Sequence, residues 1–87
     1  MECLITINDP EGLHARPAAE FVKAADCFQS KIEVSFGSQI ANAKSLLSLL
    51  KLGIKKGQSM VVRAEGPDAE KALSELSTIF SNEVKSI

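Results

Sequence analysis

The residue best suited to chemistry is His14, the one histidine in this chain of 87 residues. It lies between a glycine-containing turn and a predicted helix start, within residues 12–18. A helix start presents unpaired N–H groups and the positive end of the helix dipole, which stabilise an anion held there. Arg16 adds a guanidinium that can pair with phosphate oxygens, and neutral imidazole offers a nucleophilic nitrogen. The combination predicts a reversible phosphoryl acceptor, although a lone histidine near a helix start is commonly a cap or a surface residue.

The other residue types favour a group carrier over an enzyme. The chain has no second histidine, and no Ser-His-Asp set or glycine-rich phosphate loop accompanies His14. Cys3 and Cys27 lack CxxC spacing, so we expect neither a zinc site nor any other metal, and no cofactor. Both thiols are expected to be reduced, partly buried packing residues.

Hydrophobic patterning predicts seven elements that position these residues. Strands are indicated where apolar residues alternate, at 3–8, 31–36, 39–42 and 59–65. A first helix takes Pro17 into its first turn and ends within 27–30. A short second helix spans 43–53, with Ser45 as its N-cap and Gly53 as a left-handed terminator. A long closing helix runs from 69 to 80.

The order β-α-β-β-α-β-α predicts an α+β fold in a single domain, residues 1–87. A four-stranded, mainly antiparallel sheet with three helices on one face buries one face of each strand and leaves the polar face in water. Ten basic and eleven acidic residues give a net charge of −1, which argues against nucleic-acid binding. No apolar stretch could cross a membrane and no secretory signal is present, so we expect a cytoplasmic protein without membrane insertion.

Two sequence motifs together resemble one known family. The first is Gly-Leu-His-Ala-Arg-Pro-Ala-Ala at residues 12–19. The second is Asn-Ala-Lys-Ser-Leu-Leu at residues 42–47, followed by Leu-Gly at 52–53. Over nearly its whole length the chain is similar to the histidine-containing phosphocarrier (HPr) family of the bacterial sugar phosphotransferase system. The expected element order is that family's open-faced β-sandwich.

The resemblance implies a role for the histidine motif. His14 would accept a phosphoryl group on Nδ1 from phosphorylated enzyme I, itself charged by phosphoenolpyruvate, and pass it to enzyme IIA components. Arg16 would steady the phosphoryl oxygens. The N–H groups of Ala15, Arg16 and Ala18 are further candidates, because phosphoryl transfer depends on positioning and charge stabilisation. Such a protein is a stoichiometric carrier and not an enzyme.

Ser45 is a second candidate site. As a bare sequence feature it is an ordinary helix N-cap. By the resemblance it matches a serine that an ATP-dependent HPr kinase/phosphorylase modifies in many Gram-positive bacteria, which makes the carrier a regulator of carbon catabolism. The chain departs from that form of the family at Ser48, where glycine is usual, and at Leu46 and Leu47, where Ile-Met is frequent.

A docking face is predicted on the short second helix. Leucines occur nearly all round it, and one small core cannot bury every side. We expect Leu46, Leu47 and Leu50 to remain partly exposed for transient binding, although a helix pressed tightly into the sheet is the alternative. A basic rim for acidic partners is expected from Lys23, Lys44 and Lys51, which as scattered lysines are otherwise simply solvated. We expect a monomer.

Three rival functions stay open. The chain could be a regulatory binding module, in which the state of His14 or Ser45 controls docking to a transcription regulator or metabolic enzyme without sugar-transport flux. A nitrogen-related phosphotransferase branch would differ only in partners. An unrelated two-layer α/β enzyme is the third, and it has a single candidate nucleophile with a supporting cation.

Overall fold

The structure, a computed structural model, describes residues 1–80, and it confirms the predicted order of elements. Residues 81–87 of the predicted domain lie outside the described residues. The strands are β1 (Glu2–Thr6), β2 (Lys31–Phe36), β3 (Gln39–Asn42) and β4 (Ser59–Glu65). The helices are α1 (Ala15–Ala25), α2 (Leu46–Lys51) and α3 (Ala69–Thr78).

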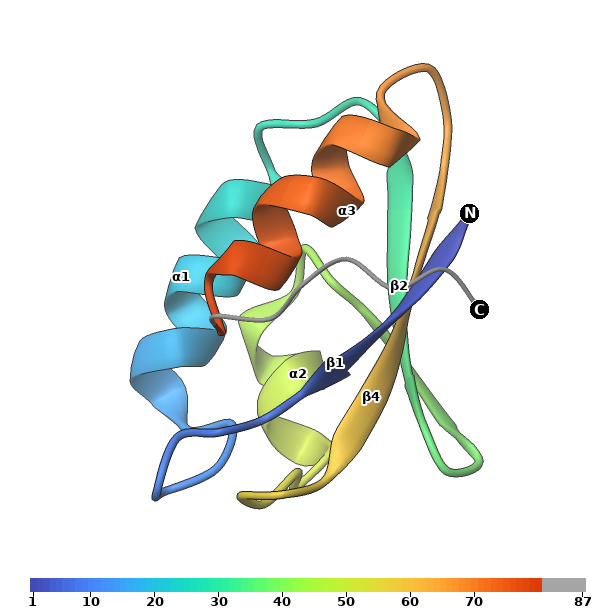
Figure 1. Cartoon of the computed structure of the whole chain (residues 1–87). Helices are drawn as coiled ribbons and strands as arrows, with labels where there is room; N and C mark the ends of the chain where they lie inside the picture. The colour runs from blue at the N-terminus through green and yellow to red at the C-terminus, as the bar shows by residue number, and fades with distance from the viewer. Residues whose placement is uncertain (81–87) are drawn as a thin grey trace.

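The four strands form one sheet in the order β1-β4-β2-β3, in which every neighbouring pair is antiparallel. All three helices lie on the same side of this sheet (Figure 1). Cys3, Val62, Val34 and Ala41 are partners in register across the four strands, and all four are buried. The α+β, open-faced sandwich predicted from the sequence is therefore confirmed, with a sheet that is antiparallel throughout.

The open face of the sheet is less polar than expected. Its middle row runs from Leu4 through Val61 and Ser35 to Ile40, as the strand register shows. Leu4 is 40% exposed and Ile40 is 68% exposed. The β-branched side chains of Ile40 and Val61 suit the pleated backbone on either face, so strand propensity can account for them on the side without helices; it does not account for Leu4.

The first helix ends earlier than its apolar stripe. α1 stops at Ala25, whereas the sequence predicts an end within 27–30. The N–H groups of Cys27 and Phe28 donate to the carbonyls of Ala24 and Ala25, both at 3.1 Å, in the tighter i to i−3 pattern of a helix end. Phe28 is nevertheless buried. The apolar periodicity in the sequence therefore predicts which residues are buried, and this burial continues into the turn after the helix.

The other element ends also shift by a few residues. β1 ends at Thr6, short of the predicted residue 8, and α2 is confined to Leu46–Lys51. α3 ends at Thr78, and Phe80 lies in the following turn. Its ring still packs on Phe21 of α1, with ring centroids 5.9 Å apart. Among the described helices, none is long and apolar enough to cross a membrane.

The two cysteines differ in their surroundings. Both are free thiols. Cys3 is fully buried in the sheet, which raises the pKa of its thiol by desolvation. Cys27 is exposed, so the expectation that both are partly buried is wrong for this residue. Cys27 lies in the turn beyond α1, where its Sγ donates to the carbonyl of Lys23 at 3.5 Å on the exposed side of the turn.

Candidate functional site

His14 is the N-cap residue of α1 and has an extended backbone, with φ −88° and ψ −175°. Its side chain makes no capping hydrogen bond, so the capping alternative does not describe it. The ring is 30% exposed. It opens into a shallow hollow between the β1–α1 loop, the first turn of α1 and the end of α3, which Arg16, Glu20 and Phe80 also line.

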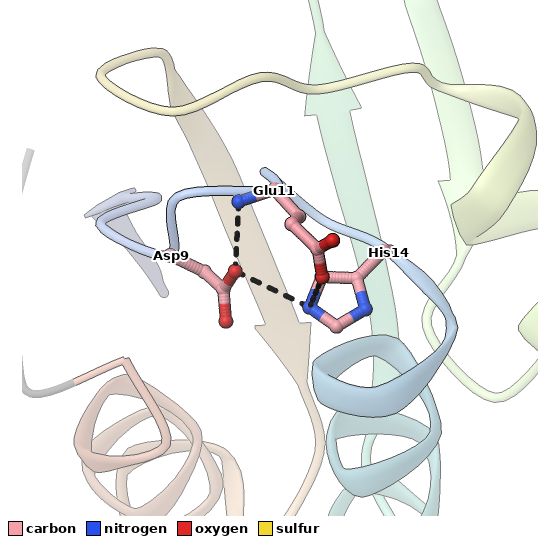
Figure 2. A network of polar contacts seen from close by, with 3 residues as sticks. All are labelled: Asp9, Glu11 and His14. Carbon is pink, nitrogen blue, oxygen red and sulfur yellow. Dashed lines mark hydrogen bonds and ion pairs between the residues drawn. The ribbon is translucent and has the colours of Figure 1, made fainter.

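The imidazole is oriented by two carboxylates of the preceding loop. Nε2 of His14 lies 3.2 Å from Oδ1 of Asp9 and 3.6 Å from Oε2 of Glu11. Figure 2 shows both dashed contacts converging on this one nitrogen, while the second ring nitrogen lies on the edge turned away from Asp9. Within residues 1–80, both of these contacts are made to Nε2 and no hydrogen bond or ion pair involves Nδ1.

Asp9 is itself held in a tight turn. Its Oδ1 accepts the N–H of Glu11 at 2.9 Å, and its carbonyl accepts the N–H of Gly12 at 2.9 Å. The pKa of the Asp9 carboxyl is lowered, first by the hydrogen bond from the Glu11 N–H and further by the neighbouring His14 and Arg16. An ionised carboxylate is therefore fixed beside the ring at neutral pH.

The rest of the loop is anchored to the segment before β4. The N–H of Leu13 donates to the carbonyl of Ile54 at 2.9 Å, and Leu13 is buried. The N–H of Gly57 donates to the carbonyl of Ile7 at 2.8 Å, at the other end of the loop. These long-range bonds, rather than the local sequence, set where His14 emerges.

The start of α1 offers fewer N–H groups than the sequence indicates. Among the described residues, the N–H groups of Ala15 and Arg16 have no hydrogen-bond acceptor. Ala18 is different, because its N–H donates to the carbonyl of His14 at 3.1 Å in the first turn of the helix. Its predicted role as a backbone donor to phosphate is therefore wrong for this conformation. Pro17, between them, has no N–H.

Ser45 occupies the predicted N-cap of α2. Its Oγ accepts the N–H of Ser48 at 3.4 Å, and its carbonyl accepts the N–H of Leu49 at 3.1 Å. Gly53 follows the helix with φ +65°, the left-handed conformation expected of a terminator. The capping role of Ser45 is confirmed, and the residue is only partly buried.

The leucines of α2 divide into two groups. Leu49 is fully buried and attaches the helix to the core, whereas Leu46 is 38% exposed and Leu47 is 64% exposed. Leu50 is intermediate and packs against the core cluster. The alternative of a helix buried on all sides is thus excluded. α2 packs beside α1, the helix whose N-cap is His14.

The three lysines of the expected rim also differ from one another. Lys23 and Lys51 are exposed, each in the last turn of its helix. Lys44 is partly buried, and its Nζ donates to the carbonyl of Phe28 at 2.9 Å. Lys44 therefore serves the packing between the end of α1 and the start of α2, and we remove it from the expected rim.

Sequence reasoning treats Asp9 and Glu11 only as turn residues and misses their contacts with the ring. The available signal is two acidic residues placed five and three positions before the single histidine. One carboxylate oxygen from each of these residues and one ring nitrogen of His14 lie within 4.8 Å of one another, a spacing that would suit the ligands of a cation. The direct contacts between ring and carboxylates explain this grouping, and we assign no metal to it.

Comparisons with known proteins show the family to which the chain belongs. Residues 1–82 match the family described as PTS HPr component phosphorylation site. The phosphocarrier protein HPr of Buchnera aphidicola subsp. Acyrthosiphon pisum is 43% identical over 77 residues, which are 88% of this chain and 91% of that protein. A crystal structure of HPr from Thermoanaerobacter tengcongensis has a TM-score of 0.88 at 40% identity, covering 92% of this chain and 90% of that one.

A longer protein contains a similar stretch. A multiphosphoryl transfer protein of Xanthomonas campestris is 43% identical over 77 residues, which are 88% of this chain but 9% of that protein. The family match and the similar curated proteins place the chain in the class of small phosphocarriers of the phosphotransferase system. The chain belongs to the HPr family.

Proposed function

We propose that His14 is the phosphoryl acceptor of this carrier. Its Nδ1 takes the group from phosphorylated enzyme I, which phosphoenolpyruvate charges, and enzyme IIA components then remove it. The observation that supports this best is the orientation of the ring, in which Nε2 faces Asp9 and Glu11 (Figure 2) and no residue in the described part of the chain bonds to Nδ1. A neutral imidazole with its proton on one nitrogen carries the reactive electron pair on the other.

The surroundings of His14 suit a phosphoryl group. The exposed guanidinium of Arg16 lines the same hollow and can pair with two phosphoryl oxygens. The N–H groups of Ala15 and Arg16 stand at the positive end of an eleven-residue helix. With Ala18 excluded, these two amides and the Arg16 side chain are our proposed stabilisers of the transferred charge.

The protein would act as a stoichiometric carrier and not as an enzyme. The hollow at His14 is lined by one histidine, one arginine and one asparagine, Asn8, together with acidic and apolar residues. That set is sufficient to hold a phosphoryl group between two partner proteins, each of which supplies its own donor or acceptor. We place this exchange in the cytoplasm, where phosphoenolpyruvate is made, and propose that the carrier works as a monomer.

Partner docking is proposed on the exposed side of α2. Leu46, Leu47 and the partly exposed Leu50 form a small apolar surface, and Lys51 adds a cation at its edge. Lys23 contributes a second cation from α1. A surface of this size suits transient contact with enzyme I and enzyme IIA, since weak encounter complexes bury little area.

Regulation through Ser45 is a second part of the proposal. Its Oγ makes a capping bond of 3.4 Å, long for a hydrogen bond, and the residue is partly exposed beside Leu46. A phosphate from an HPr kinase/phosphorylase would add roughly two negative charges at this edge of the docking surface. We expect it to repel acidic partner surfaces and leave the fold intact, because a helix start tolerates negative charge.

The alternative function is a regulatory binding module that docks to a transcription regulator, in carbon or nitrogen control, without sugar-transport flux. A transfer assay separates the two. Wild type is charged with enzyme I and phosphoenolpyruvate, and loss of its phosphate to added sugar-specific enzyme IIA is followed with time. Rapid discharge supports the carrier; a charged protein that retains its phosphate in the presence of active enzyme IIA supports the regulatory module.

A further inference from the structure

The contact between the ring and Asp9 does more than orient His14. Oδ1 of Asp9 accepts the N–H of Glu11 at 2.9 Å and also lies 3.2 Å from Nε2 of His14. The first bond fixes the carboxylate in the turn, so the oxygen near the ring is held in place before any partner arrives. Oε2 of Glu11 is the second carboxylate oxygen near this nitrogen, at 3.6 Å from Nε2. Two carboxylates thus face one edge of the imidazole.

We propose that Asp9, supported by Glu11, is a positioning residue that keeps a proton on Nε2 of His14 throughout the transfer cycle. The inference rests on the proposed role of His14 as phosphoryl acceptor. A carboxylate accepts a hydrogen bond and cannot donate one while ionised, so it selects the tautomer with the proton on Nε2. Nδ1 then carries the lone pair that attacks phosphorus.

The chemical step balances without any proton leaving the site. The Nδ1 lone pair forms the bond to phosphorus while the bond between phosphorus and the donor breaks, and the donor keeps that electron pair. The imidazole, which retains its Nε2 proton, becomes positively charged, and the Asp9 carboxylate neutralises that charge. On discharge the electrons of the Nδ1–P bond return to Nδ1, and the ring is again neutral with its proton on Nε2.

Other charged groups around the ring do not compete for this proton. Arg16 and Glu20, from the first turns of α1, line the same hollow. The contacts to Nε2 come from Asp9 and Glu11, and from no other acidic group of residues 1–80. Arg16 has no acceptor atom. Glu20 therefore supplies a matched control, as a carboxylate of the same hollow that does not contact the ring.

The tautomer can be read directly from the unphosphorylated protein. We would label the histidine with 15N and record its ring nitrogen shifts at a pH where the imidazole is neutral, in wild type, Asp9→Asn, Glu20→Gln and the double variant Asp9→Ala with Glu11→Ala, which removes both acceptors. Wild type, Asp9→Asn and Glu20→Gln should show the Nε2–H form alone, because an amide oxygen still accepts. The double variant should show both tautomers; unchanged nitrogen shifts in it would overturn the proposal.

The same variants are then charged with enzyme I. Hydrogen bonds to charged groups are worth enough to slow acceptance by roughly tenfold or more in the double variant, with Asp9→Asn between it and wild type. Acceptance by the double variant at the wild-type rate would also overturn the inference. If wild type itself gains no phosphate, the proposed function fails instead, and the two failures are distinguished by that one sample.

Discussion

Gly12 lies directly against Ile54, so closely that a Cβ atom added to Gly12 would overlap the carbonyl oxygen of Ile54 and stand 2.9 Å from Cα of Lys55. Gly12 also has φ +73°, a backbone conformation that residues with a side chain rarely adopt. The same carbonyl oxygen accepts the N–H of Leu13. Two residues before His14, the chain is therefore pressed onto the segment that leads into β4.

Substitution of Gly12 tests this contact. Gly12→Ala should lower the free energy of unfolding by more than Gly37→Ala, which has a similar φ of +61° but open space around its Cβ position. Gly37→Ala should cost about 1–2 kcal/mol from backbone strain alone. Urea denaturation of both variants measures the difference. Equal losses would mean that the loop yields to the added methyl group.

Arg16 should matter for transfer and not for folding. Its side chain is exposed, so Arg16→Glu is expected to change the free energy of unfolding by about 0.5 kcal/mol or less. Phosphoryl acceptance should slow by roughly a hundredfold, because a positive group at the transferred charge is replaced by a negative one. Rapid-quench transfer from phosphorylated enzyme I measures this, with Arg16→Lys as the conservative control. Wild-type kinetics in Arg16→Glu would remove Arg16 from the site.

The leucines of α2 should separate binding from stability. Leu47→Ser should weaken docking to enzyme I, seen as a raised KM, and change stability by about 0.5 kcal/mol or less, because Leu47 is mostly exposed. Leu49→Ala should cost about 2–5 kcal/mol of stability, because Leu49 is fully buried. Enzyme I kinetics and urea denaturation on both variants test the division. An unchanged KM in Leu47→Ser would place docking elsewhere.

Asp68 should make stability depend on acid pH. Its carboxylate accepts the hydroxyl of Ser30 and the N–H groups of Gln29 and Ser30, the latter two at 2.9 and 3.0 Å. The Ser30 hydroxyl, followed by the Gln29 N–H, lowers the pKa of this carboxyl. The resulting stabilisation is complete above the unfolded value of about 3.9 and is lost as pH falls through the lower folded value.

The variant Asp68→Ala removes these bonds. It should be less stable than wild type at neutral pH, and the difference should shrink as the solution is acidified below the ordinary carboxyl range. Urea denaturation at a series of pH values measures it, with Glu75→Gln, an exposed carboxylate on the same helix, as control. A difference that stays constant into acid would show that Asp68 acts through packing and not through its charge.

Local patterns predicted the fold well because each element carries its own signal. Alternation around Cys3 and Ile5 placed β1, and the stripe through Leu73 and Leu76 placed α3. Helix ends were less accurate, since Phe28 is buried whether or not the helix reaches it. The apolar pattern reports burial, and only backbone hydrogen bonds define where a helix stops.

The site was predictable in part. His14 and Arg16 stand in one short motif, so the sequence identified them together. The Asp9 contact depends on the geometry of the turn, and the bond from Lys44 to the Phe28 carbonyl joins residues 16 positions apart. The Lys44 contact forms only when the start of α2 packs beside the end of α1, so it has no local signal, whereas the acidic residues just before His14 are the only sequence signal for the contact with the ring.

The most direct measurement is the intact mass of wild type and His14→Ala after incubation with phosphoenolpyruvate, Mg²⁺ and purified enzyme I. A parallel sample is acidified before analysis, because a phosphate on histidine nitrogen is labile in acid. We predict that wild type gains one phosphate that acid removes, and that the folded His14→Ala gains none. A phosphate that appears equally on His14→Ala, or a wild type that gains none with active enzyme I, would contradict the assignment of His14 as the acceptor.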